Sequence, residues 1–193
     1  MSEDTAKPDP VAIAYEVAVS VDPSSTATVS ADVFIEISTP THQLVFDASG
    51  LSVKTVSVHG PDYSQKAKLE MLSGNLVLSF TRTLDPGTYR VFMELTTSLQ
   101  CDAAGSIFLA PGQLLFPLLQ PPGLTTMQLR TTTLYDLDVA VGTQPITTTR
   151  SKIHKVTTFA PTPPMNPREL TLRVTPLPTS SHLTPGMHAQ TTH

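Results

Sequence analysis

The side chains that could do chemistry are few in this chain, and they are scattered along it. A hydrolytic zinc site needs two histidines a helical turn apart, a third ligand, and a glutamate that takes a proton from the metal-bound water. No HExxH occurs, and the six histidines have no such spacing: His42, His59, His154, His182, His188 and His193. We therefore expect surface histidines, with no metal site and no cofactor.

Three other features could suggest chemistry, and each has a simpler interpretation. Cys101 is the one cysteine, which excludes an internal disulfide framework and a cysteine-based zinc cluster. Asp136 and Asp138, in LYDLDV, would share a strand face as a carboxylate pair, but edge-strand acids that discourage aggregation are the favoured interpretation. RSKIHK at 150–155 is interpreted as a solvated turn. With no GxSxG elbow and no glycine-rich phosphate loop either, the sequence predicts no catalytic residues and no enzyme.

Composition indicates one compact β domain. The chain has 193 residues, and at that size roughly two-thirds or more of the unfolded surface can be buried, enough for a substantial core. Hydrophobic residues make up 39% and charged residues 15%; tryptophan is absent, while the β-favouring residues valine and threonine are abundant.

Charge and hydropathy exclude several classes of partner. A formal net charge of -4 gives no electrostatic footprint for nucleic acid or for an anionic membrane. The polar start MSEDTAKPDP is not a secretion signal, and no later stretch reaches the length of a membrane span. We expect a cytoplasmic protein that binds neither nucleic acid nor membrane, with a nuclear location left open.

Period-two alternation of apolar residues dominates the chain. In VAIAYEVAVSV at 11–21 the alternating residues Val11, Ile13, Tyr15, Val17, Val19 and Val21 are expected to share one buried face. Similar runs recur at 31–38, 43–47, 51–58, 75–81 and 88–95, with turn residues between them at 73–75 and 84–89. At most one helical turn is expected, within 62–71. The predicted fold is all-β, an antiparallel sandwich or curved sheet.

These patterns divide the chain into three segments. Residues 1–10 are expected to be a flexible N-terminus, residues 11–176 the β domain, and residues 177–193 a disordered tail rich in proline and threonine.

An apolar segment without alternation, SIFLAPGQLLFPLLQPPGL at 106–124, interrupts the pattern. Its prolines delete ladder donors, so we expect a loop and not a central strand. It could be a plug over one end of the sandwich or an interface for a protein partner. The candidate interface residues are Ile107, Phe108, Leu109, Leu114, Leu115, Phe116, Leu118 and Leu119.

Three stretches together resemble the end of the N-terminal domain of the aminopeptidase N family of zinc metallopeptidases. They are FPLLQPP at 116–122, the strand at 128–145 and KVTTFAPTPPM at 155–165, which are similar to that family's FPCFDEP, following strand and TTxFxxTPPMSTYL. The resemblance covers about residues 12–175. It implies that KVTTF is a strand and that APTPPM turns into a last strand, ELTLRV at 169–174.

The chain departs from this family at positions that matter for catalysis. Gln120, Pro121 and Pro122 stand where the family has Asp-Glu-Pro. Counting back from Phe116 without gaps, the family residue that grips a substrate's amino terminus falls on Phe108, and its arginine falls on Gln113. A phenyl ring cannot hold an ammonium group as a carboxylate does.

Our leading hypothesis is therefore a pseudoenzyme: a non-catalytic aminopeptidase-like β domain that binds a protein partner through the apolar segment 106–124. The alternative is the N-terminal domain, a wall of the substrate cleft, of a zinc aminopeptidase whose catalytic part is on a separate or missing polypeptide. A structural subunit of a larger assembly, as in a transcription factor subunit of this fold, is a third hypothesis.

Overall fold

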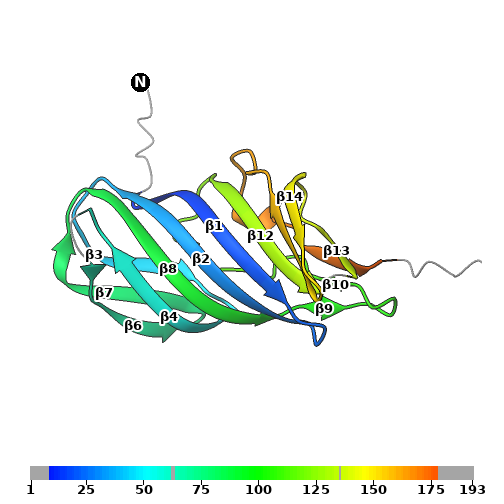
Figure 1. Cartoon of the computed structure of the whole chain (residues 1–193). Helices are drawn as coiled ribbons and strands as arrows, with labels where there is room; N and C mark the ends of the chain where they lie inside the picture. Colours follow the sequence, from blue (N-terminus) through cyan, green and yellow to red (C-terminus); the bar gives the residue numbers. More distant parts are fainter. Residues whose placement is uncertain (1–8, 62–63, 135, 178–193) are drawn as a thin grey trace, which may run out of the picture.

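The computed structural model describes residues 9–61, 64–134 and 136–177, and these form strands arranged in three sheets (Figure 1). The predictions of a flexible N-terminus and a disordered tail fall almost entirely on residues 1–8 and 178–193, which lie outside the described residues. One short 3₁₀ helix, η1 (Pro167–Glu169), occurs within the described part. The all-β prediction is confirmed.

Eight strands form one long twisted sheet. Their order is β14 (Pro145–Arg150), β15 (His154–Phe159), β12 (Thr126–Leu134), β1 (Val11–Val21), β2 (Thr26–Ile37), β8 (Gly87–Ser98), β4 (Ser52–His59) and β5 (Ser64–Gln65).

Two small sheets of four strands each lie against this long sheet, towards its opposite ends (Figure 1). The first has the order β11 (Leu118–Leu119), β3 (Thr41–Asp47), β7 (Asn75–Leu84) and β6 (Ala67–Leu72). The second has the order β13 (Leu137–Ala140), β16 (Arg173–Pro176), β10 (Ile107–Phe108) and β9 (Gln100–Cys101). The core is the apolar layer between the long sheet and the small ones.

In strand β1 the alternation pattern predicts the buried side chains correctly from Tyr15 onward, but not at Ile13. Tyr15, Val17, Val19 and Val21 are buried, as the pattern predicts. The prediction is wrong for Ile13, which is 44% exposed. The reason is a register shift between Ala12 and Ala14 in the pairing with β2, since one extra residue in a strand turns the next side chain to the other face.

Among the described strands, the pairs are antiparallel with one exception. Strands β1 and β12 run parallel, with Tyr15 opposite Met127 and Val19 opposite Thr131. The long sheet is therefore mixed, and the chain must cross the molecule between these two central strands.

Two predicted strands have different bounds in the structure. The strand at 128–145 is two strands, because β12 pairs with β1 and β15 whereas β13 pairs with β16 in another sheet. The last strand is not 169–174 but β16, Arg173–Pro176. Asn166 Oδ1 accepts a hydrogen bond from Arg168 N (3.1 Å) and starts η1, so residues from Pro167 onward first form a 3₁₀ turn.

No helical turn occurs between Ser64 and Met71, where β5 and β6 lie instead. The predicted turn at 73–75 is confirmed as a tight hairpin between β6 and β7, with positive φ at Ser73 and Gly74. The φ of +86° at Gly74 favours glycine, and a Cβ added there would lie 2.7 Å from Ser49 Oγ, so that hydroxyl would have to move.

Tyr15 joins the long sheet to the segment that follows β10. Its ring lies 5.0 Å from that of Phe116, centroid to centroid, at an angle of 39°. Its hydroxyl accepts a hydrogen bond from Leu119 N at 3.1 Å, inside the core. Burial of the ring raises the pKa of Tyr15 to about 12, against a smaller lowering by that hydrogen bond.

We predict that Tyr15→Phe destabilises the fold, because Leu119 would keep a buried N–H group without its acceptor. The expected loss in free energy of unfolding is about 1–3 kcal/mol at pH 7, measured by urea denaturation. A loss under about 0.3 kcal/mol would mean that the hydrogen bond is of no consequence.

We also predict that the stability difference between the native protein and Tyr15→Phe depends on pH. The folded state keeps Tyr15 protonated up to a pKa of about 12, above the ordinary value of 10, so its stabilising contribution is complete below pH 10 and is lost as the pH rises through that window. The stability gap between the native protein and Tyr15→Phe should shrink by about 2–3 kcal/mol between those limits. A gap that stays constant would contradict the raised pKa.

Candidate functional site

The apolar segment 106–124 lies mostly inside the molecule. It begins with β10 in one small sheet and reaches β11 in the other, so it joins the two small sheets under the long one. Six of the eight candidate interface residues belong to the core: Ile107, Leu114, Leu115, Phe116, Leu118 and Leu119. This burial agrees with the first of the two alternatives for the segment, a plug inside the sandwich. Of the eight, Phe108 and Leu109 alone keep partly exposed side chains that could touch a partner directly.

The prediction of a loop without central strands also needs correction. Ile107 and Phe108 pair on both sides, with β9 and β16, whereas Leu118 and Leu119 pair with the end of β3. The prolines of the segment lie outside both pairs, as expected for residues that lack an N–H donor.

Gln113, one of the two positions where the family resemblance places a substrate-binding residue, holds the segment in place. Its Oε1 accepts a hydrogen bond from Ala110 N at 3.1 Å, and its Nε2 donates to Ser98 O. Phe108, the other position, lies in β10 opposite Gln100 and Arg173. Both residues therefore serve the local structure of β10 and the turn after it.

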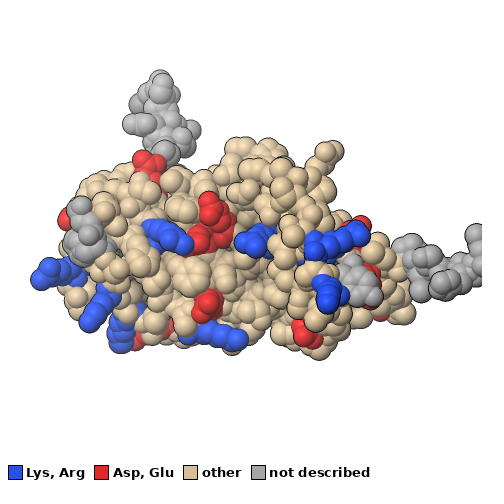
Figure 2. Space-filling view, in the orientation of Figure 1, with Lys and Arg blue, Asp and Glu red and all other residues tan. Residues whose placement is uncertain are grey.

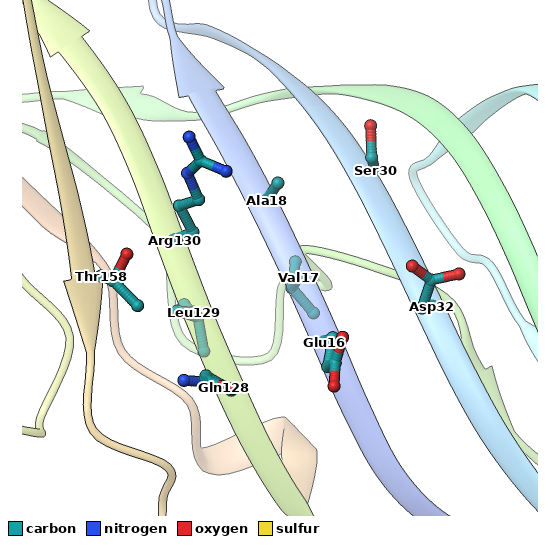
Figure 3. A pocket seen from close by; sticks show the side chains of 9 residues that line it. All are labelled: Glu16, Val17, Ala18, Ser30, Asp32, Gln128, Leu129, Arg130 and Thr158. Atoms are coloured by element: carbon teal, nitrogen blue, oxygen red, sulfur yellow. The ribbon is translucent and has the colours of Figure 1, made fainter.

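A hollow of about 360 Å³ on the outer face of the long sheet was not anticipated from the sequence. Small side chains form its floor, notably Ala18 and Ser30, which are opposite each other on β1 and β2. Figure 3 shows Arg130 on one side of this floor and the carboxylates of Glu16 and Asp32 farther along the strands. The alternation pattern places these residues on the solvent side, but their grouping depends on strand order.

Charges of both signs line this hollow, namely Arg130 and the carboxylates of Glu16 and Asp32 (Figure 3). Glu16 and Asp32 are direct cross-strand neighbours, an arrangement that weakens pairing unless a cation compensates. Arg90 supplies that cation through two hydrogen bonds to Asp32, of 2.6 and 2.9 Å. These bonds, and the nearby charge of Glu16, raise the pKa of Arg90. The hollow offers charged contacts but no paired nucleophile and base.

Lys155, in β15 of the long sheet, is a buried lysine that faces the second small sheet. Its side chain is 4% exposed, and its Nζ lies 3.0 Å from Asp138 Oδ1 of β13. That hydrogen bond holds the pKa of Asp138 below its ordinary value, although partial burial opposes it. Asp138 is in the edge strand β13, as predicted, but Asp136 lies in the preceding turn, so the two do not share the face of one strand.

A second ion pair fixes the segment after TPPM. Arg168 of η1 contacts Asp47 at the end of β3. Partial burial would raise the pKa of Asp47, but hydrogen bonds from the side chain and backbone of Ser49, together with Arg168, hold it below its ordinary value. The end of the domain is thereby attached to the first small sheet.

The described residues contain no group of three or more histidine, cysteine, aspartate or glutamate side chains placed to hold a metal ion. His42 and His59 lie in different sheets and bind nearby hydroxyl groups, and His154 begins β15. His182, His188 and His193 fall outside the described residues. Within the same described part, no helix has the length and apolar character needed to cross a bilayer.

Comparison with solved structures identifies the architecture. The M1 zinc metallopeptidase from Deinococcus radiodurans matches 87% of this chain with a TM-score of 0.73 and 18% identity, over 42% of its own length. A mutant of that enzyme bound to a Tyr-Ser-Ala substrate matches 87% of this chain and 43% of its own, at 19% identity and the same TM-score of 0.73. A two-domain M1 zinc metallopeptidase mutant bound to L-tryptophan covers 88% and 43%, at 18% identity and a TM-score of 0.73.

This chain has the fold of an M1 aminopeptidase N-terminal β domain. The predicted fold resemblance is thus confirmed, and the aminopeptidase-like domain spans less than half the length of the metallopeptidases that it matches. No protein-family model matches the chain, and no curated protein matches it either.

The Lys155–Asp138 pair in this domain yields a prediction. In Asp138→Asn, the ammonium group of Lys155 would remain buried without its carboxylate, so we expect a loss of about 1–3 kcal/mol in free energy of unfolding. Lys155→Met should cost less, because it removes the buried charge itself. Urea denaturation at pH 7 measures both.

Two controls separate this effect from a general loss of charge. Lys68→Met, which removes an ion pair with a 73% exposed lysine, should change stability by less than about 0.5 kcal/mol. The pKa of Asp138 is lowered in the folded state. The native protein should therefore exceed Asp138→Asn in free energy of unfolding by the full amount above the unfolded pKa of about 4, and this difference should vanish as the pH falls further. An equally large gap in acid would contradict the pairing.

Proposed function

We propose that this aminopeptidase-like β domain is a non-catalytic module that binds a protein partner or serves as a scaffold. The proposal rests on Phe108 and Gln113, the two positions where the family resemblance places substrate-binding residues. Phe108 lies in β10, which pairs with β9 and β16, and the side-chain amide of Gln113 bonds the backbone of Ala110 and Ser98. Neither side chain offers a carboxylate or a guanidinium to a peptide substrate.

The contact surface that we propose is the exposed part of segment 106–124. Phe108 and Leu109 are partly exposed, and Leu124, at the end of the segment, is 71% exposed. Apolar side chains of this size contribute most to binding when a partner removes them from water. The buried residues of the segment would then support this surface from below.

The proposal also includes a cytoplasmic location, with the nucleus left open. Cys101 is unpaired and exposed, as a reducing compartment permits. The acidic net charge of -4 favours a protein partner over nucleic acid or an anionic membrane.

We predict that the tagged chain, recovered from its native cells under mild salt, retains a protein partner at near-stoichiometric amounts. Cross-links to that partner should map to segment 106–124. The double variant Phe108→Ser with Leu124→Ser should lose most of the partner, whereas Ile153→Ser, which changes a 58% exposed isoleucine elsewhere, should keep it. A stable monomer recovered alone, or equal partner recovery by all three proteins, would contradict the proposal.

A second candidate function is the N-terminal domain of a zinc aminopeptidase whose catalytic part is on a separate or missing polypeptide. It is supported by the match to 42% of an M1 zinc metallopeptidase at a TM-score of 0.73. In that case, the recovered partner would be a metallopeptidase chain. It should cleave peptides from their amino terminus, and a zinc chelator should stop the cleavage.

A further inference from the structure

An apolar slot runs along one open side of the sandwich, between β4 of the long sheet and β6 of the first small sheet. It has a volume of about 120 Å³, and its apolar lining includes Val53 and Val56 on one side and Leu69 and Met71 on the other. We call this surface the β4–β6 slot. It lies at the opposite edge of the first small sheet from β11, so it is separate from segment 106–124.

The residues of the slot belong to the core face of their strands. Leu69 is opposite Leu78, and Met71 is opposite Leu76, in the pairing of β6 with β7. Leu78 and Leu76 are buried, yet Leu69 is 48% exposed and Met71 is 51% exposed. The apolar layer of the sandwich therefore continues to this edge and is left open to solvent there.

The two strands that border the slot differ in how well their edges are protected. Strand β4 has a register shift between Val53 and Thr55, which leaves Lys54 as the extra residue, and β5 covers its end at Val58 and His59. A bulge is a common device against strand addition, because it breaks the regular row of backbone groups. Strand β6 pairs with β7 on one side, and no other described strand pairs with it, so Ala67–Leu72 presents a regular free edge.

The charge of this edge is positive although the whole chain is acidic. Within residues 52–58 and 64–72 there are three lysines, Lys54, Lys66 and Lys68, and a single carboxylate, Glu70. Lys68 and Glu70 form an exposed ion pair of 2.6 Å, and Lys54 and Glu70 both line the slot. Lysines still outnumber carboxylates three to one in these segments. Basic side chains gather at this end of the molecule in Figure 2.

We propose that the β4–β6 slot binds an extended, acidic peptide segment of a partner protein, added as a further strand to β6. Alternate apolar side chains of that segment would enter the slot against Leu69 and Met71, and its acidic side chains would lie near Lys66 and Lys68. Strand addition supplies main-chain hydrogen bonds, and the pockets for alternate side chains supply specificity. The positive edge disfavours a second copy of this chain, since two such edges would repel each other.

The test uses a labelled eight-residue peptide of alternating glutamate and valine, with a lysine–valine peptide as its matched control. Fluorescence anisotropy with the full chain should show at least about ten-fold tighter binding of the acidic peptide, equivalent to about 1.4 kcal/mol. That preference should fall as salt is raised, because these charges are exposed.

Variants assign the binding to the slot. Leu69→Ser with Met71→Ser should weaken the acidic peptide about ten-fold or more, whereas Ile146→Ser, at a 57% exposed isoleucine of edge strand β14, should not. Lys66→Glu with Lys68→Glu, at exposed positions where folding is not at risk, should remove the preference for the acidic peptide. Hydrogen exchange should slow at Ala67–Leu72 on binding and stay unchanged in β14.

Several results would overturn the proposal. One is binding that the serine and glutamate variants leave unchanged, and another is protection of β14 in place of β6. A third is a concentration-dependent dimer, seen by sedimentation, that the serine variant dissolves, because the occupant would then be a second copy. Loss of the partner at segment 106–124 would not change any of these measurements, so this proposal and the proposed function fail separately.

Discussion

The burial of segment 106–124 between the sheets is the constraint on which the rest of the structure depends. The segment carries the chain from one small sheet to the other, and each end of it contributes a short strand to one of them. Phe116 lies against Tyr15 of the long sheet, and both side chains are almost fully buried. Six residues of the segment belong to the same apolar core as buried residues of all three sheets.

A buried irregular segment must find partners for its backbone, and this one uses several kinds. Leu119 N donates to the Tyr15 hydroxyl, and Gln120 N donates to Val45 O at 2.8 Å. At the other end, the side chain of Gln113 serves both a donor and an acceptor of the backbone. The side chain of Gln113 is therefore held by the backbone of its own domain on both sides.

Much of the fold could be predicted from the sequence because half-buried strands impose alternation. Tyr15, Val17 and Val19 were predicted on one buried face for this reason. The same local pattern could not predict the shift at Ile13 or the division of 128–145 between two sheets, since both depend on which strands become neighbours. Lys155 shows a further limit, because its burial requires a carboxylate from β13, and nothing within KVTTF indicates where that carboxylate lies.

The parallel pairing of β1 with β12 has a consequence for how the chain acquires its structure. The first strand of the domain cannot complete its pairing on one side until the chain as far as Thr132 is available. Strands β1, β2 and β8 can associate earlier as an antiparallel unit, with β1 as its temporary edge. Contacts between residues so distant in sequence raise the contact order and slow folding. During synthesis, an apolar strand edge therefore stays open for much of the domain's length, a period in which a chaperone or an early partner has most to protect.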